Sequence, residues 1–114
     1  MSILDVEQAR WAGERGNVLR TLKESYVQEM TSVGSLIRVL DAQGTSLSQE
    51  DLEFHLRYLV DQGYLQIWRA RDMAGFRADR PSRVKPSTMM FARLLPKGLQ
   101  LIDGLIAEDP SVAF

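Results

Sequence analysis

The apolar pattern changes from a helical to an extended period at Gly63, and this change constrains the fold more than any other feature of the chain. Before it, four aliphatic residues recur at three- and four-residue spacings and share one helix face: Leu52, Leu56, Leu59 and Val60. After it, Leu65 and Ile67 alternate with other residues, as in a strand with one buried face. A helix that passes into a strand across one glycine predicts a mixed α and β fold.

Both ends of this helix are marked in the sequence. Ser48 is a good N-cap, and Asp51 lies three residues on, near the capping-box position. Glu50 and Asp51 also complement the positive end of the helix dipole. The helix is expected to run to Gln62 and to stop at Gly63.

The first 30 residues are predicted to be helical in two pieces. The second piece carries an apolar stripe that includes Val18 and extends to Met30. Gly13 and Gly16 are expected to separate it from a shorter helix over Ile3–Ala12, because glycine weakens a helix interior by about 1 kcal/mol relative to alanine. Residues 1–16 would then be an N-terminal helical extension.

A short connector and one more helix precede Ser48. Thr31–Val33 favours β structure. The segment "SLIRVLDAQG" places three aliphatic residues on one helix face and ends at Gly44: Leu36, Ile37 and Leu40.

The C-terminal half is predicted to hold two strands and one helix. "YLQIWRARDM" and "TMMFARLL" have strand character, and the long loop between them contains two prolines, so residues 64–95 should form a β-hairpin. A last helix is expected over 96–109, beginning at Pro96 and ended by Pro110. Its apolar face would contain Leu99, Ile102, Leu105 and Ile106.

Length and composition narrow the class of protein. A chain of 114 residues suits a single domain over residues 1–114. It has no apolar run of about 18 residues, so no membrane span is expected, and "MSILDVEQARW" lacks the features of a secretory signal, which favours the cytoplasm. There is no cysteine, and His55 is the only histidine. We therefore expect no metal, no cofactor and no enzymatic activity, and we expect His55 to pack or to form hydrogen bonds.

The charges are segregated along the chain. Residues 1–68 carry six Lys/Arg and ten Asp/Glu, and residues 98–114 carry three acids and no base. Residues 69–97 carry two acids and eight bases, a balance of +6: Arg69, Arg71, Arg77, Arg80, Arg83, Lys85, Arg93 and Lys97. Positive charge concentrated in one segment attracts polyanions, although an arginine-rich solvated loop would give the same pattern.

The segment "SQEDLEFHLRYLVDQGYLQI" resembles the third helix and following strand of winged helix-turn-helix repressors of the ArsR, MarR and PadR types. Leu52, His55, Leu56, Leu59 and the run from Gly63 to Leu65 stand at the matching positions. "RLLPKGLQLIDGL" is similar to the start of the helix after the wing, so the resemblance covers most of residues 17–107. It implies an α+β winged helix with a three-helix core, a β-hairpin wing and additional N- and C-terminal helices. The function that it implies is DNA binding by a small transcriptional regulator.

In such domains the outer face of the third helix enters the major groove. Here that face carries Glu50, Phe54, Arg57 and Asp61, with Glu53 at its flank, and acids near phosphates weaken binding. The basic hairpin is therefore expected to carry most of the affinity. The predicted nucleic-acid-binding residues are Arg57, Arg69, Arg71, Arg77, Arg80, Arg83 and Lys85.

Two further interpretations remain open. Trp68 and Phe76 flank these bases, and interleaved aromatic and basic residues also suit single-stranded nucleic acid, although Trp68 could simply be half-buried. Alternatively, Phe54 and Tyr58 could anchor a protein partner.

A homodimer is a separate expectation, because DNA-binding winged helices often match two half-sites. Its apolar surface would come from the terminal helices, unless these residues only close the monomer: Ile3, Val6, Trp11, Leu99, Ile102 and Ile106.

Overall fold

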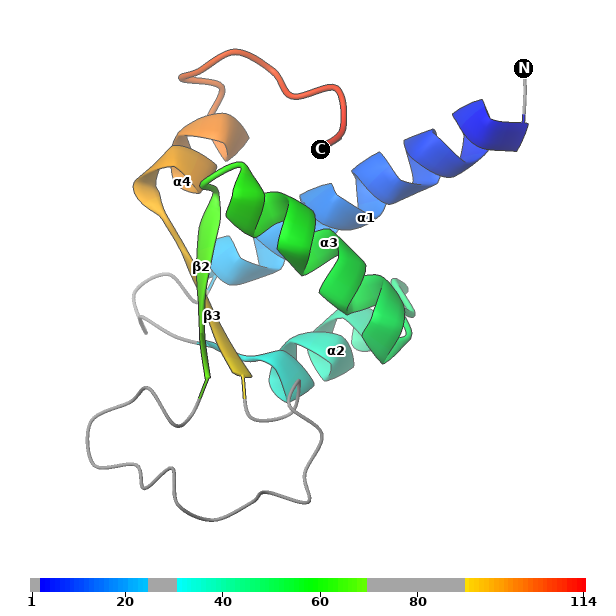
Figure 1. Ribbon diagram of the computed structural model, residues 1–114, viewed down its shortest axis with the longest axis vertical. Coiled ribbons are helices and arrows are strands. Elements are labelled where there is room, and N and C mark those ends of the chain that lie inside the picture. The colour runs from blue at the N-terminus through cyan, green and yellow to red at the C-terminus, as the bar shows by residue number, and fades with distance from the viewer. Residues whose placement is uncertain (1–2, 25–30, 70–89) are drawn as a thin grey trace.

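The computed structural model of the protein describes residues 3–24, 31–69 and 90–114, which form helices around a small antiparallel sheet (Figure 1). The described elements are α1 (Ile3–Glu24), β1 (Thr31–Ser32), α2 (Val33–Ala42), α3 (Gln49–Asp61), β2 (Leu65–Arg69), β3 (Met90–Leu94) and α4 (Pro96–Ile102). The α+β class predicted from the sequence is confirmed. Within these three ranges, no helix has the length and apolar character needed to cross a membrane.

α1 is one continuous helix, so the prediction of two helices separated by glycines was wrong. At Gly16, a Cβ atom would overlap the carbonyl oxygen of Ala113, whereas Gly13 has no atom within 4 Å of that position. Gly16 therefore allows close packing of the C-terminal segment and does not interrupt the helix. The buried residues of the C-terminal half of α1 offset the helix-weakening effect of the two glycines. Residues 3–16 are consequently part of a longer helix and not a separate extension.

α3 begins and ends where the sequence predicts. The Ser48 hydroxyl accepts a hydrogen bond from the backbone N–H of Asp51 at 3.1 Å, which caps the helix. Gly63 has a φ of 78°, a left-handed conformation that favours glycine, and Tyr64 N donates to Leu59 O at 3.0 Å. The chain thus leaves α3 and enters β2 in a direction fixed by one glycine.

The sheet has the strand order β1–β3–β2, with both pairings antiparallel. The β2–β3 hairpin pairs five residues of each strand, from Leu65 opposite Leu94 to Arg69 opposite Met90. β1 completes the sheet at the other edge of β3, which confirms the predicted short β connector. Residues 70–89, which hold the rest of the predicted wing, lie outside the described residues, as do residues 25–30.

The core lies between α1, α2, α3 and the inner face of the sheet. It contains mainly aliphatic side chains: Val18, Leu19, Leu22, Val33, Leu36, Leu40, Leu52, Leu56, Leu59, Tyr64, Leu65, Ala92, Leu94, Leu101 and Val112. Val60, which the helical pattern placed on the packed face of α3, is 37% exposed, whereas His55 is 1% exposed. The centre of the packed face is therefore shifted toward His55, because α1 covers that side of α3.

α4 ends at Ile102, so the prediction of a helix over residues 96–109 was wrong. Gly104 adopts a left-handed φ of 73°, and Leu105 N donates to Gln100 O at 2.9 Å, which closes the last turn. Leu105 is 73% exposed and does not extend an apolar helix face. The chain beyond it forms a tail, residues 103–114, that crosses back toward α1 (Figure 1).

Substitution of two helical glycines by alanine should change the free energy of unfolding in opposite directions. A Cβ at Gly98 would overlap the carbonyl oxygen of Tyr64 and the Leu94 side chain, so Gly98→Ala should lower the free energy of unfolding by about 1–3 kcal/mol. Gly13→Ala adds a methyl group in open space and should raise it by about 0.5–1 kcal/mol. Chemical denaturation of both variants measures these shifts. A Gly98→Ala protein as stable as Gly13→Ala would contradict the packing of α4 on Tyr64.

Candidate functional site

The outer face of α3 carries charge of mixed sign with an acidic excess. Arg57, the only predicted nucleic-acid-binding residue whose side chain the structure describes, is exposed there. Glu50 and Asp61 are exposed on the same face, and Phe54 is 48% exposed. This face can contribute one cation to a polyanion, but its carboxylates oppose close approach of phosphates.

Of the remaining predicted nucleic-acid-binding residues, Arg69 is in a described strand. It is the last residue of β2 and pairs with Met90. The side chain of Arg69 is not described, and the other predicted bases lie outside the described residues: Arg71, Arg77, Arg80, Arg83 and Lys85.

The outer face of the hairpin carries a set of residues that the sequence analysis did not bring together. Trp68 on β2 pairs with Phe91 on β3, and Gln66 pairs with Arg93. The Arg93 guanidinium lies 5.8 Å from the centroid of the Trp68 ring. Phe76, the other aromatic residue that flanks the predicted bases, lies outside the described residues. The period-two alternation of β3 could have identified Phe91 and Arg93 as the neighbours of Trp68 once the register was known.

Tyr58, one of the two predicted protein-contact residues, is engaged within the chain. Its hydroxyl donates to Asp109, at 3.0 Å to Oδ1 and 2.8 Å to Oδ2, and the Arg15 guanidinium lies 4.1 Å from its ring centroid. Phe54 contacts the Trp11 ring edge-on, with centroids 5.4 Å apart, and keeps about half of its surface exposed. Of the predicted pair, Phe54 is therefore the more exposed, and Tyr58 is half-buried.

His55 lies in a buried polar cluster with two residues of α1. The Nε–H of Arg15 donates to His55 Nδ1 at 3.2 Å, and His55 Nε2 lies 3.0 Å from Glu14 Oε2. Because arginine has no acceptor, Nδ1 must accept and Nε2 must carry the proton that bonds Glu14. Both ring nitrogens are thus occupied, which confirms the predicted hydrogen-bonding role of His55.

Asp109 fixes the C-terminal tail to the same side of the molecule. Besides Tyr58, its carboxylate accepts from the Tyr64 hydroxyl at 2.8 Å and from the backbone N–H of Ser111 at 2.9 Å. The carbonyl oxygen of Ser111 accepts from Arg15 at 3.3 Å, and Ala113 N donates to Ala12 O at 2.9 Å. No local pattern of residues predicts this network, because its members are far apart in the chain.

Burial and hydrogen bonding shift the pKa values of this network. Burial lowers the pKa of His55 below its ordinary 6.5 and outweighs the opposing effect of Glu14. Burial, followed by the bond to Asp109, raises the pKa of Tyr64 far above 10. Burial acts to raise the pKa of Asp109, but the hydrogen bonds from Ser111, Tyr64 and Tyr58 hold it below its ordinary value. Neutral His55 and ionised Asp109 are therefore the forms that the fold stabilises at neutral pH.

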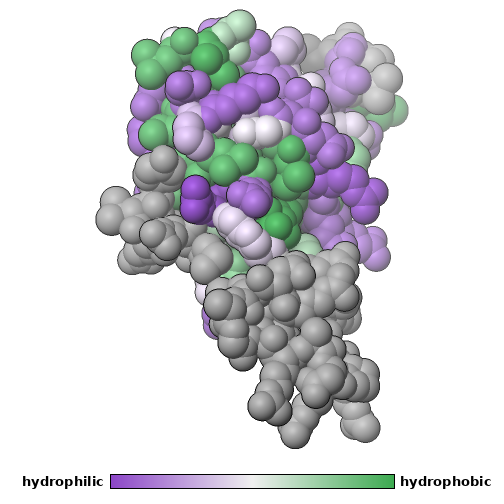
Figure 2. Space-filling view, turned by 60° about the vertical axis from the view of Figure 1, so that its left-hand side comes forward, coloured by the Kyte–Doolittle hydropathy of each residue, from purple (hydrophilic) through white to green (hydrophobic). Residues whose placement is uncertain are grey.

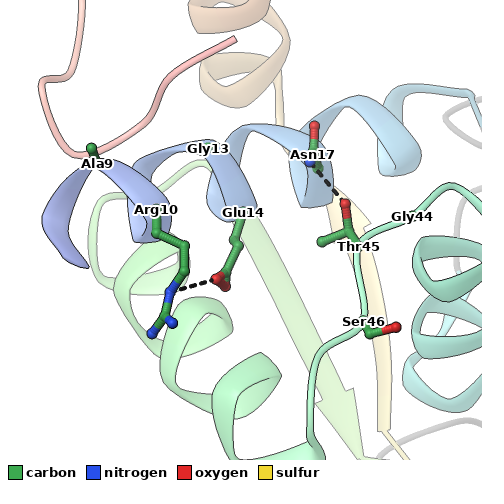
Figure 3. A pocket seen from close by; sticks show the side chains of 8 residues that line it. All are labelled: Ala9, Arg10, Gly13, Glu14, Asn17, Gly44, Thr45 and Ser46. Carbon is green, nitrogen blue, oxygen red and sulfur yellow. Dashed lines mark hydrogen bonds and ion pairs between the residues drawn. The ribbon is translucent and has the colours of Figure 1, made fainter. Parts of the chain in front are cut away.

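A shallow depression of about 360 Å³ lies between α1 and the turn that joins α2 to α3 (Figure 3). Its lining residues are Ala9, Arg10, Gly13, Glu14, Asn17, Gly44, Thr45 and Ser46. Arg10 and Glu14 form an ion pair at 3.3 Å, and Asn17 donates to Thr45 at 3.0 Å. Since these polar side chains bind one another, we assign no ligand to the depression.

No family model, no curated protein and no solved structure matches this chain. Among residues 3–24, 31–69 and 90–114, no three His, Cys, Asp or Glu side chains lie close enough to hold a metal ion.

The His55 cluster predicts a loss of stability on acidification. Because the pKa of His55 is lower in the folded chain than its ordinary 6.5, the unfolded chain binds a proton more readily below that pH. The free energy of unfolding should be constant for this group above pH 6.5 and should fall as the pH drops below it. Urea denaturation across this range measures the effect. His55→Gln, which keeps a donor and an acceptor but does not titrate, should show a weaker dependence, and a His55 pKa of 6.5 or higher by NMR would contradict the prediction.

Asp109 predicts a second, local effect on stability. Asp109→Ala leaves the Tyr58 and Tyr64 hydroxyls without their acceptor and should lower the free energy of unfolding by about 1–3 kcal/mol. Glu108→Ala removes the neighbouring exposed carboxylate and should change it by about 0.5 kcal/mol or less. Chemical denaturation compares the two variants, and equal effects would show that the tail is not held by Asp109.

Proposed function

We propose that the chain is a nucleic-acid-binding winged-helix protein that contacts its ligand mainly through the β2–β3 hairpin. The observation that supports this proposal is the position of the charge. The segment with a balance of +6, residues 69–97, coincides with the hairpin, its connecting residues and the start of α4. A hairpin whose strands are joined by a basic segment can follow a phosphate backbone or enter a minor groove.

The arrangement of the elements supports the winged-helix assignment. Three helices and a short strand precede the hairpin, and the first strand adds to the far edge of β3, giving the order β1–β3–β2. In a winged helix, α3 would be the recognition helix and the hairpin would be the wing. A small transcriptional regulator acting in the cytoplasm is the role that suits such a domain.

The charged side chains on α3 limit how much this helix can contribute to binding of the nucleic acid. Arg57 can bind one phosphate, while exposed Glu50 and Asp61 limit how closely the helix approaches the duplex. We therefore assign affinity to the hairpin and only a positioning contact to α3.

Titration of a labelled random-sequence duplex at low salt tests the proposal. Binding should be detectable at tens of micromolar protein or below. If about five bases each neutralise a phosphate, the logarithm of the association constant should fall with the logarithm of the salt concentration at a slope near −4 to −5. Fluorescence anisotropy at several salt concentrations measures both quantities.

Paired substitutions locate the contact. Arg77→Ala with Arg80→Ala should weaken binding and reduce the salt slope by about 2. Arg10→Ala with Arg20→Ala, which removes the same charge from exposed positions on α1, should have a smaller effect. Equal losses from the two pairs, or no binding of the duplex at tens of micromolar, would contradict duplex binding by the hairpin.

A protein-contact function is the second candidate, and the half-exposed Phe54 ring beside Trp11 favours it. If no duplex bound, comparison of proteins retained by wild type and by Phe54→Ala would test this alternative.

Self-association would also need an exposed apolar surface. Ile3 and Val6 are 83% and 54% exposed on the part of α1 that projects beyond α3 (Figure 1).

The terminal residues of the predicted dimer interface divide into two groups. Leu99, Ile102 and Ile106 are partly buried and pack against the core, whereas Ile3 and Val6 are exposed. A homodimer stays a prediction.

A further inference from the structure

We propose that the outer face of the β2–β3 hairpin is a stacking platform for unpaired bases, so that the protein binds single-stranded nucleic acid there. The inference rests on the proposed nucleic-acid-binding function and specifies both the surface and the form of the ligand. The platform consists of Trp68 and Phe91, with Arg93 and Gln66 beside them.

The strand register places these four side chains on one face. Leu65, Leu94 and Ala92 are buried, and they alternate along their strands with Gln66, Arg93 and Phe91. Since successive residues of a strand point to opposite faces, the second set points away from the core. Trp68 follows the buried-side residue Ile67 and therefore belongs to this outer set too.

The two rings form a cross-strand pair at the solvent side of the sheet. Trp68 and Phe91 are directly opposite one another and each keeps part of its surface accessible. The apolar side chains that pack on the core include Ile67 and Met90 from the same strands, but neither of these two rings. Figure 2, turned toward the side on which the hairpin lies, shows apolar residues interleaved there with strongly hydrophilic ones.

The polar neighbours suit a nucleotide ligand. The exposed Arg93 guanidinium, 5.8 Å from the Trp68 ring centroid, can stack on a base or bind a phosphate. The exposed Gln66 side chain has both a donor and an acceptor for a base edge. Bases of any identity stack on aromatic rings, so this surface would accept sequences with little preference.

The positive charge of the hairpin strands and of the residues next to them favours a nucleic acid, which is a polyanion, as the ligand of this surface. Residues 65–69 and 90–97 carry three bases and no acid, namely Arg69, Arg93 and Lys97, whereas residues 1–68 carry an excess of four acids. A duplex cannot use the two rings in the same way, because its bases are already stacked and paired. The platform therefore selects for unpaired strands.

Fluorescence of a single tryptophan tests stacking directly. The chain has two tryptophans, so Trp11→Phe leaves Trp68 as the only one. Its emission should be quenched as a short oligothymidylate of about 12 nucleotides binds, because a stacked base quenches an indole. Trp11→Phe keeps an aromatic ring beside Phe54 and leaves the platform residues unchanged, and circular dichroism establishes that this variant is folded.

Two variants with the same chemical change test the location. Phe91→Leu should weaken binding of the oligothymidylate about 10-fold, while Phe54→Leu, at a half-exposed ring on α3, should change it less than about 2-fold. Circular dichroism of each variant establishes that it is folded.

The outcomes separate this inference from the proposed function. Quenching of Trp68 with the selective loss in Phe91→Leu supports the platform. Oligothymidylate binding without quenching, or duplex binding with no measurable single-strand binding, would overturn the platform and leave nucleic-acid binding by the hairpin standing. Failure to bind either form would overturn both.

Discussion

The buried guanidinium of Arg15 is the interaction on which the arrangement of α1, α3 and the C-terminal tail depends. A buried cation destabilises a fold unless its donors and its charge are satisfied. Here the donors bind His55 and the carbonyl oxygen of Ser111, the charge lies near Asp109, and the guanidinium carbon lies 4.1 Å from the centroid of the Tyr58 ring. These partners come from α3 and from the tail, so satisfying Arg15 requires all three segments to meet at one place.

Because these three segments meet at one place, the polar network lies at one end of the sheet. Asp109, Tyr58 and Tyr64 hold the tail at the end of the sheet where Leu65 and Leu94 adjoin α3 and α4. The hairpin tip at Arg69 and Met90 lies at the opposite end, where no residue of this polar network is found among those described. Among the described residues, the internal polar contacts of this network therefore stabilise one end of the sheet and leave the hairpin end to other contacts, such as that of Arg93 with the Trp68 ring.

Much of the fold could be predicted because its signals are local. The cap at Ser48, the glycine at Gly63 and the alternation after it each act within a few residues, and the structure has them where the sequence placed them. The errors at α1 and α4 have a different origin. Gly16 serves a contact with Ala113, at the other end of the chain, and a tail anchored by Asp109 replaces the expected last turns of helix. The polar cluster and the Trp68–Phe91 pair likewise depend on contacts between distant segments, which spacing along the chain does not reveal.

The acidic excess on α3 also bears on where a nucleic acid could bind. The outer faces of α3 and of the sheet both point away from the core, but on different sides of it (Figure 1). Exposed charges are largely screened beyond about 8–10 Å at physiological salt, so Glu50 and Asp61 act mainly on a ligand that lies along α3 itself. A duplex that engaged α3 and the hairpin together would meet these carboxylates. A single strand on the outer face of the hairpin would meet Arg93 and the two rings instead, which makes the charge pattern of the whole chain consistent with the second mode of binding.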